Sequence, residues 1–229
     1  MKIFTFKKER VGNSLFAQSS FKSFIVLVVM MIMTTASAMA EVVDGLNYKF
    51  DSVSKTAILL SNTDRYSGDI IVPEKVKCND GIEYTVVALG DKCFYDCYDL
   101  TSITIPTTVK SFGGCCFSGC SSLTSITIPS SVTSLGESSF EGCSNLTSIT
   151  IPSSVTSLGE SCFDGCTSLT SITIPSSVTS LGTFCLSGCT SLTSIHISSS
   201  VSSLKSGCFS NCKGLTSVII PSSVKLLER

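Results

Sequence analysis

The chain has 229 residues, of which 43% are hydrophobic and 14% are charged, and its formal net charge is −1. This apolar content is enough to build a packed core, so the composition excludes a disordered chain, and the length suits one ordinary domain or a short repeat array. The balanced charge excludes proteins that bind nucleic acid or an anionic bilayer through a basic surface.

The first 40 residues have the order of a secretory signal peptide. Basic residues between Lys2 and Lys22 precede an apolar run from Phe24 to Met33, and small residues follow up to Ala40. A membrane anchor is the alternative interpretation, but the ten strongly apolar residues fall short of the roughly 20 that span a bilayer. The sequence therefore predicts a signal peptide over residues 1–40, cleaved after Ala40, and an exported protein without a transmembrane span.

The segment that follows is typical of a β-hairpin. Residues 46–60 contain two alternating segments around a short polar turn. Such a hairpin would cover the open edge of the first repeat, where strand hydrogen bonds are otherwise unpaired. We therefore expect an N-terminal β-hairpin cap at residues 41–67.

The start of the repeat array contains an insertion. Val72-Pro73 matches the later pair Ile105-Pro106, but the two pairs are 33 residues apart instead of 23. A hairpin near residues 76–87 explains the extra length, because Asn79-Asp80-Gly81 is a turn signal between two alternating segments. The predicted solenoid occupies residues 68–229.

A string of 23 residues then recurs along the chain. In one copy, Leu123, Ile126 and Ile128 have an L-x-x-I-x-I spacing that alternates like a β-strand, and the proline that follows ends the strand because it lacks an N–H group. Val132 and Leu135 form a second apolar pair, which predicts a short second strand. The recurring leucines are Leu100, Leu123, Leu146, Leu169, Leu192 and Leu215.

Each copy ends in a turn. We call the residues at one position of successive repeats a column. The large apolar residues of the turn form the column Phe117, Phe140, Phe163, Leu186 and Phe209. Another column contains only residue types that tolerate positive φ, and we expect it to close a short helical turn: Asp96, Gly119, Gly142, Gly165, Gly188 and Asn211. A third column favours glycine without requiring it: Gly90, Gly113, Gly136, Gly159, Gly182 and then Lys205.

The fixed period predicts a repeat solenoid, mainly β. Specifically, we expect a right-handed leucine-rich-repeat array with one main parallel β-sheet, short second strands and short helical turns. One coil cannot bury enough apolar surface to fold alone, so stability comes from stacking on its neighbours. The last copy stops at Arg229 before its turn, and such an open edge invites end-to-end pairing with a second chain. Because Lys225, Glu228 and Arg229 put charge on this edge, we expect instead an incomplete final coil that frays or belongs to a truncated reading frame.

The string LTSITIPSSVTSLGESCFDGC, together with the YSGDIIVP segment and its hairpin, closely resembles the BspA-like leucine-rich-repeat family of bacterial surface proteins. The likeness covers nearly the whole mature chain. It implies a secreted or cell-surface protein of a host-associated bacterium, with adhesion to host proteins or other cells as the usual role. The family places alanine at one cysteine column, so the resemblance implies that these cysteines fill a small core slot: Cys93, Cys116, Cys162, Cys185 and Cys208.

Thirteen cysteines are the most conspicuous feature, and five pairs have C-x-x-x-C spacing. A metal site would need four converging ligands. In a sixth pair, Ser139 replaces the first cysteine while Cys143 keeps the second, which suits a packing slot better than a ligand set. We therefore predict packing cysteines and no metal site, with disulfides left open. Because thirteen is an odd number, at least one thiol stays unpaired within a monomer, and Cys78 and Cys115, which lie outside the repeated columns, are the expected ones.

The chain lacks the residues of an active site. Its serines repeat in register, whereas a catalytic serine needs one base held against it. The only histidine, His196, takes the place of threonines at an exposed strand position. The sequence contains no paired carboxylates, phosphate-binding loop or nucleotide fingerprint. We predict no enzymatic activity, no cofactor and no small-molecule substrate.

The outward positions of the main strands form the candidate binding face. Alternate residues share a face and neighbouring strands lie about 4.8 Å apart, which predicts a flat lattice of hydroxyl groups. Such a surface can hydrogen-bond weakly over a wide area but lacks the aromatic and arginine anchors that concentrate binding energy. The candidate residues are Ser102, Thr104, Ser125, Thr127, Ser148, Thr150, Ser171, Thr173, Ser194 and His196. Residues vary more on the turn, at Lys92, Glu137, Glu141, Glu160, Asp164, Phe184 and Lys213.

These observations favour a secreted or cell-surface, adhesin-like binding module for protein partners on host or neighbouring cells. A structural spacer is the first alternative, because near-identical repeats can simply supply length. Ice or crystal binding by the regular Ser-x-Thr lattice is a minor alternative, since such arrays also arise passively from repeat duplication.

Overall fold

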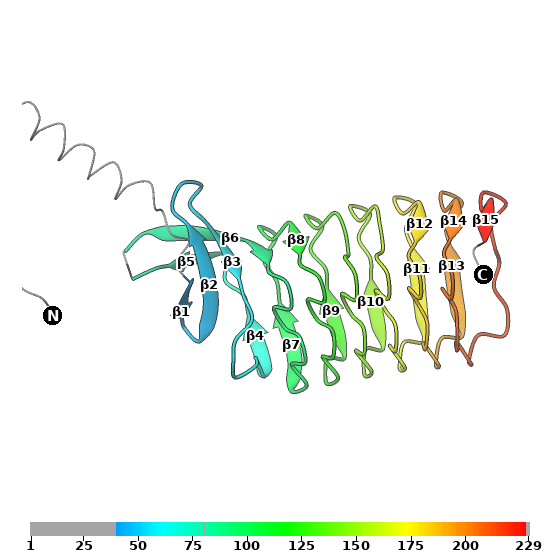
Figure 1. Ribbon diagram of the computed structural model, residues 1–229, viewed down its shortest axis with the longest axis horizontal. Coiled ribbons are helices and arrows are strands. Elements are labelled where there is room, and N and C mark those ends of the chain that lie inside the picture. The colour runs from blue at the N-terminus through cyan, green and yellow to red at the C-terminus, as the bar shows by residue number, and fades with distance from the viewer. Residues whose placement is uncertain (1–39, 80, 228–229) are drawn as a thin grey trace, which may run out of the picture. The chain divides into compact units, whose positions relative to one another are not determined.

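The structure, a computed structural model, describes residues 40–79 and 81–227. The predicted signal peptide, apart from Ala40, and the terminal Arg229 lie outside the described residues. All regular elements of the described part are β-strands. From residue 68 onward the chain stacks in successive coils (Figure 1).

The N-terminal mixed sheet has the order β1-β2-β3-β6-β5, with β8 beside β6. Antiparallel pairs join β1 to β2, β2 to β3 and β5 to β6, whereas β3 and β6 run parallel. Along β2, Tyr48 and Phe50 are buried and Lys49 is exposed, because successive residues of a strand face opposite sides. The strands are β1 (Ala40–Val43), β2 (Leu46–Asp51), β3 (Thr56–Leu59), β5 (Lys75–Lys77), β6 (Glu83–Leu89) and β8 (Ser111–Phe112).

Two antiparallel pairs of this sheet, β2/β3 and β5/β6, lie where the sequence predicts hairpins. Sequence reasoning missed a third hairpin, β1/β2, which closes at Asp44-Gly45 with φ values of 50° and 80°. Positive φ at both central residues is the geometry of a type I′ turn, for which Asp-Gly is a preferred pair. The role of this sheet as a cap and the hand of the coils stay predictions.

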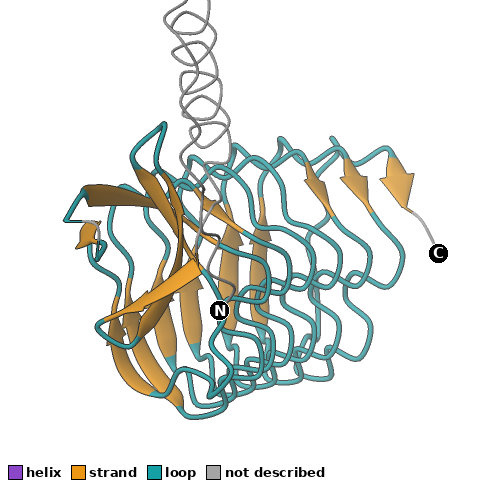
Figure 2. Ribbon diagram, turned by 60° about the vertical axis from the view of Figure 1, so that its left-hand side comes forward, coloured by secondary structure: helices purple, strands orange, loops and turns teal. Residues whose placement is uncertain are grey.

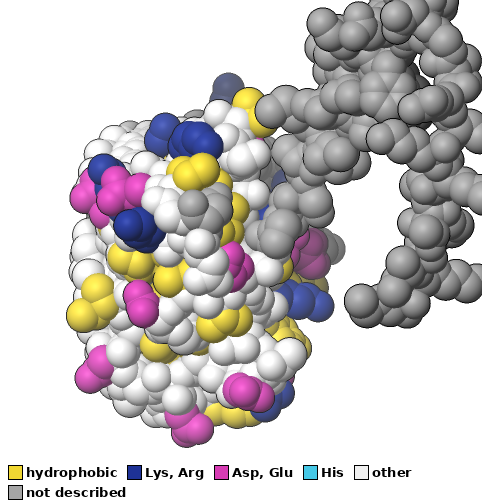
Figure 3. All heavy atoms as spheres, turned by 90° about the vertical axis from the view of Figure 1, so that its left-hand side faces the viewer, with side chains coloured by type: hydrophobic (Ala, Val, Ile, Leu, Met, Phe, Trp, Pro, Cys, Tyr) yellow, Lys and Arg dark blue, Asp and Glu magenta, His cyan; other side chains and the backbone are white. Residues whose placement is uncertain are grey.

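The end of the described unit that carries this sheet is not uniformly polar. Seen from that end, apolar side chains lie among basic and acidic ones (Figure 3). Exposed apolar residues of the N-terminal strands and turns include Val42 and Val53, at 58% and 84% exposure. The mixed sheet therefore leaves some of its apolar area uncovered.

The main face of the solenoid is a row of short parallel strands, which pair as β4 with β7, β9 with β10 and β11 with β13. Backbone bonds continue the row between these pairs, since the N–H of Thr170 donates to the carbonyl of Thr147 at 3.4 Å. The strands are β4 (Gly68–Ile71), β7 (Leu100–Thr104), β9 (Ser125–Thr127), β10 (Ser148–Thr150), β11 (Ser171–Ile174) and β13 (Ser194–Ile197).

The predicted short second strands form another parallel row. They comprise β12 (Ser180–Leu181), β14 (Ser203–Leu204) and β15 (Leu226–Leu227), and single bridges at Leu135 and Leu158 extend the row backward. In the described residues no bridge joins Phe112 to Leu135. At that step a phenylalanine occupies the leucine column and packs edge-on against Phe117, with ring centres 5.5 Å apart. The larger side chain thus coincides with the interruption.

The turn side of each coil contains no helix in the described residues (Figure 2), so the expected short helical turns are wrong. The N–H of Phe117 donates to the carbonyl of Ser139, one coil later, at 2.9 Å. Two residues further along, the N–H of Gly119 donates to the backbone carbonyl of Glu141 at 2.7 Å. An α-helix would need these donors for carbonyls four residues back. The N–H groups of Ser118 and Cys120, by contrast, donate within the turn to the carbonyls three residues back, each at 3.2 Å, so the donors alternate between the turn and the next coil and form no helix.

Two columns of each turn have positive φ. The predicted column from Asp96 to Asn211 has φ between 55° and 77°, which confirms its left-handed geometry. Sequence reasoning missed a second column, whose φ lies between 50° and 65°. Only one of its members is glycine, so its residue types give no signal of this geometry. The members are Lys92, Cys115, Ser138, Ser161, Phe184 and Gly207.

Several positions of the third glycine column have no room for a side chain, although the sequence suggests only a preference for glycine. A Cβ atom added to Gly182 would lie 2.4 Å from the carbonyl oxygen of Gly159, and Gly113 and Gly159 are equally crowded by backbone atoms of the preceding coil. Where Lys205 replaces glycine, its N–H lies 3.4 Å from the carbonyl of Leu181, against 3.1 Å for the corresponding bond of Gly182. Close approach of successive coils is the reason for glycine at these three positions, whereas a Cβ atom on Gly136 would meet only the Ser139 hydroxyl, at 3.9 Å.

The predicted column of large side chains forms the centre of the core. Phe94, Phe117, Phe140 and Phe163 stack with ring centres 5.2, 5.3 and 5.5 Å apart and with planes within 5° of parallel. Leu186 is buried at the next step. Phe117 and Phe140 therefore contact a copy on both sides, Phe94 and Phe163 contact a copy on one side, and all four side chains are buried.

Candidate functional site

The ten candidate residues of the main face, which we call the Ser/Thr face, are all exposed. They stack in register, so that Thr127 lies beside Thr150 and Thr173 lies beside His196. The serine column stacks in the same way. The structure thus brings the predicted residues together on one face, and their role in binding stays a prediction.

A separate set of threonines, just before the strands, connects successive coils. The hydroxyls of Thr147 and Thr193 donate to the carbonyls of Thr124 and Thr170 at 3.3 and 3.2 Å. By contrast, the hydroxyls of the Ser/Thr face from Ser125 to Ser194 make no intramolecular hydrogen bond to the described residues. Each of these hydroxyls keeps one donor and two acceptor sites for a partner.

The N-terminal end of the Ser/Thr face differs in chemistry. The carboxylate of Asp69 accepts hydrogen bonds from Ser102 at 2.6 Å and from Thr101 at 2.8 Å. These bonds, that of Ser102 first, lower the pKa of Asp69. Ile71 lies beside Thr104 and is 73% exposed. Sequence reasoning missed both residues, although the alignment of the two proline-ending strands places them in the serine and threonine columns.

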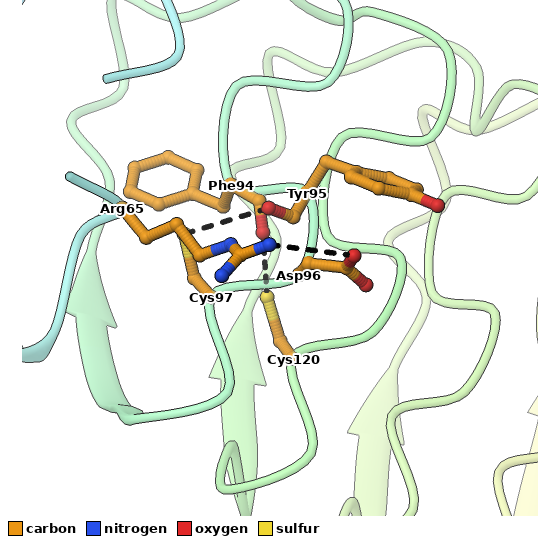
Figure 4. A network of polar contacts seen from close by, with 6 residues as sticks. All are labelled: Arg65, Phe94, Tyr95, Asp96, Cys97 and Cys120. Atoms are coloured by element: carbon orange, nitrogen blue, oxygen red, sulfur yellow. Dashed lines mark hydrogen bonds and ion pairs between the residues drawn. The ribbon is translucent and has the colours of Figure 1, made fainter. Parts of the chain in front are cut away.

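The repeated cysteines are buried, as expected of packing residues, and Cys78 and Cys115 are partly exposed. The second cysteine of each pair also makes a hydrogen bond. The thiol of Cys120 donates to the carbonyl of Phe94 at 3.1 Å (Figure 4). Cys143 makes the same bond one coil later at 3.1 Å, and burial raises its pKa to about 12. The thiol therefore stays protonated and keeps donating.

The two cysteine columns have different roles. In the first column, Ser139 is fully buried and satisfies its hydroxyl within its own turn, by donating to the carbonyl of Gly136 at 2.9 Å. The second column is cysteine in every coil from Cys97 to Cys212. Its side chain bridges to the preceding coil from Cys120 onward. The sequence signal for this bond between coils was available, because the second column contains only cysteine whereas the first accepts serine.

Across residues 40–79 and 81–227, no cluster of three or more histidine, cysteine, aspartate or glutamate side chains could hold a metal ion. Protonated, buried thiols are poor nucleophiles. His196 lies exposed beside Thr173. This arrangement offers hydrogen bonds and surface contacts to a partner.

No helix of the length and apolarity that a membrane span requires occurs among the described residues.

Residues 87–216 match the family described as BspA type leucine rich repeat region, in six copies. Among solved structures, a leucine-rich repeat protein of Bacteroides ovatus is 29% identical over 82% of this chain, with a TM-score of 0.69. A leucine-rich cell surface protein of Faecalibacterium prausnitzii is 30% identical over 85% of this chain, also with a TM-score of 0.69. No curated protein matches the chain.

The length of these relatives differs from that of this chain. The match covers 55% of the B. ovatus protein and 52% of the F. prausnitzii protein, so this chain spans about half of each. A leucine-rich repeat protein of T. pallidum is 25% identical over 83% of this chain and 86% of its own length, with a TM-score of 0.72.

Proposed function

This chain belongs to the BspA-type leucine-rich-repeat family, and from this premise we propose that it is an exported, adhesin-like module that binds proteins of host or neighbouring cells through the Ser/Thr face. The signal-peptide order of residues 1–40 supports export. The surface location stated for the F. prausnitzii relative is consistent with it. The proposed role is binding without catalysis.

The observation that carries the proposal is the row of exposed, unpaired hydroxyls on strands held in register. Bonds between coils fix the spacing of these strands, so little backbone conformational freedom remains to be lost on binding. Each hydrogen bond to a partner contributes about 0.5–1.5 kcal/mol net. Useful affinity therefore requires a partner that contacts several coils at once, as a protein surface or an extended segment can.

Charged, bulky substitutions on the face test the proposal. The parent protein is first tested on a panel of immobilised extracellular-matrix proteins. On the protein that retains it, we expect Thr127→Arg combined with Thr150→Arg to reduce retention at least tenfold, since two guanidinium groups would keep the partner from the hydroxyls. The matched control is Ser134→Arg with Ser157→Arg, which places the same change on two exposed residues of the same coils outside the face. Unchanged retention of a folded Thr127/Thr150 variant would move the binding site elsewhere.

A structural spacer is the second candidate, and the hydrogen bonds that connect every coil to the next favour it. The same panel of immobilised proteins separates the two functions, because a spacer binds none of them. Thermal hysteresis in the purified protein would instead support the ice-binding alternative.

A further inference from the structure

The turn that precedes Leu100 and the loop before β4 together carry a group of aromatic and charged side chains at the surface, which we name the tyrosine ridge: Arg65 from the loop and Lys92, Tyr95, Asp96 and Tyr98 from the turn. The Arg65 guanidinium carbon lies 5.0 Å from the centre of the Tyr98 ring, and the Lys92 ammonium lies 5.3 Å from that of Tyr95. Arg65 also approaches the Asp96 carboxylate at 3.9 Å (Figure 4). The pKa of Tyr98 is raised, mainly because its hydroxyl donates a hydrogen bond to the Asp96 carboxylate. Two cations and one carboxylate thus hold two tyrosines in place.

Other coils lack this group. Phe94 and Cys97 of the same turn are buried like their counterparts in later coils, so the core does not require the two tyrosines. Yet Tyr95 and Tyr98 are 42% and 45% exposed. At the position of Tyr95 the later coils have Ser118, Glu141, Asp164, Ser187 and Ser210. At the position of Tyr98 they have Ser121, Ser144, Thr167, Thr190 and Lys213.

The backbone that carries the tyrosine ridge is fixed from both ends. Lys92 and Asp96 have φ values of 53° and 55°, and their N–H groups donate to the carbonyls of Gly114 and Ser118, each at 2.8 Å. A tyrosine side chain has only two χ angles to restrict. Rigid tyrosines of this kind lose little conformational entropy on binding, which is why they concentrate binding energy at protein interfaces.

The charges around the ridge define the partner. Asp64 and Asp99 are exposed, and within the described part of the chain neither carboxylate makes a hydrogen bond or ion pair. Both cations of the ridge, by contrast, already lie over tyrosine rings. An incoming arginine or lysine therefore meets free carboxylates and exposed aromatic surface, both of which attract it. The two cations that could attract an acidic segment are already engaged with the tyrosine rings and with Asp96.

We propose that the tyrosine ridge docks a protein partner through a short segment in which arginine or lysine alternates with apolar residues. The cation of the segment pairs with Asp99 or Asp64, and its apolar side chains cover Tyr95 and Tyr98. This surface is separate from the Ser/Thr face and supplies the aromatic and arginine anchors that the face lacks.

Binding of a labelled peptide to the full chain tests this proposal. The probe is capped, fluorescein-labelled Arg-Leu-Arg-Leu, and the comparison peptide is Glu-Leu-Glu-Leu. Fluorescence anisotropy should show that only the arginine peptide binds, and Tyr95→Ser with Tyr98→Ser, which introduces the serines of the following coil, should weaken its binding at least tenfold. Equal affinity in a folded double variant, equal binding of the glutamate peptide, or no binding of the arginine peptide to the parent overturns the proposal.

Two further variants separate the ridge from general charge attraction and from the Ser/Thr face. Glu141→Ser with Ser144→Ala changes the equivalent positions two coils later and removes one negative charge; we expect affinity within twofold of the parent. A loss equal to that of the tyrosine variant would show that net charge alone attracts the peptide. Thr127→Arg with Thr150→Arg should leave peptide binding intact, so failure of the Ser/Thr proposal and failure of this one give different results.

Discussion

In the N-terminal mixed sheet each buried aromatic residue meets a different neighbour, whereas in the repeated coils each meets its own copy. Phe50 packs against Tyr84 with ring centres 4.7 Å apart and planes inclined by 52°. Phe140 lies between Phe117 and Phe163 in a parallel stack, with spacings of 5.3 and 5.5 Å. One packing solution thus serves several coils, while the sheet needs a separate solution at each position.

Buried polar groups show the same contrast. In the coils, the thiol of Cys166 donates to the carbonyl of Phe140 at 3.2 Å, and its counterparts repeat this bond. In the N-terminal region, the hydroxyl of Tyr66, in the loop after β3, donates to the carbonyl of Leu60 at 2.8 Å, but the buried hydroxyl of Tyr48 in β2 has no partner among the described residues. The coils satisfy such groups only where a like coil precedes them. The buried hydroxyl of Thr108, in the first coil, also has no partner among the described residues, whereas Ser154 in the same column donates to the carbonyl of Val132 at 2.6 Å.

The largest expected effect is that of a cavity in the ring stack. Phe140→Ala should lower the free energy of unfolding by about 3–5 kcal/mol. Because each coil is stabilised mainly by its neighbours, the cavity should also uncouple the two halves of the array and broaden the urea transition. Phe50→Ala is the comparison, with a similar loss but an unchanged transition for the coils. Circular dichroism during urea unfolding measures both quantities, and an equally steep transition in Phe140→Ala would contradict the proposed coupling.

Two glycines extend the comparison to the backbone. A Cβ atom at Gly159 would lie 2.5 Å from the carbonyl carbon of Gly136, whereas a Cβ atom at Gly45, where φ is 80°, has nothing within 4 Å. Gly159→Ala should therefore cost about 1–3 kcal/mol through overpacking between coils, and Gly45→Ala about 1 kcal/mol through backbone strain alone. Melting temperatures of the two variants test the order. Equal losses would mean that neighbouring coils can separate at no cost.

The repeat made much of the fold predictable. Period and alternation predicted the main strands, the phenylalanine column and the left-handed column of Asp96, because each depends on residue type at a fixed position. The helical turns were predicted wrongly because residue type does not say which carbonyl receives an N–H group. The Phe117 N–H could serve its own turn or the next coil, and only the assembled stack decides in favour of Ser139.

The candidate site was predictable to a smaller extent. Alternation placed the Ser/Thr face outward, and all ten residues are exposed. The tyrosine ridge was missed, apart from the variable Lys92, because it occurs in one coil only and includes Arg65, which lies outside the predicted repeats. Contacts between a unique segment and the first coil leave no periodic trace in the sequence.

The smallest expected effects come from removing one buried hydrogen-bond donor in each region. Cys143→Ala removes a thiol that donates to the Phe117 carbonyl and should cost about 1 kcal/mol at pH 7. Burial raises the pKa of this thiol from 9.0 to about 12. Since the folded-state pKa is the higher one, the stabilisation is complete below about pH 9 and is lost at about 1.4 kcal/mol per pH unit as the pH rises toward 12. The parent should therefore lose stability above pH 9 faster than Cys143→Ala does.

Tyr48→Phe is the counterpart in the mixed sheet, and it should have the opposite sign. Its hydroxyl is buried without a partner among the described residues, so its removal relieves a desolvation penalty and breaks no hydrogen bond. Thermal melts at pH 7 should place Tyr48→Phe level with the parent or slightly above it, and Cys143→Ala below it. Between pH 9 and 10 the gap between Cys143→Ala and the parent should narrow, whereas Ser139→Ala, a non-titrating change in the same coil, should keep a constant gap. Equal losses in Cys143→Ala and Tyr48→Phe at pH 7 would show that the unique region satisfies its buried donors as completely as the repeats do.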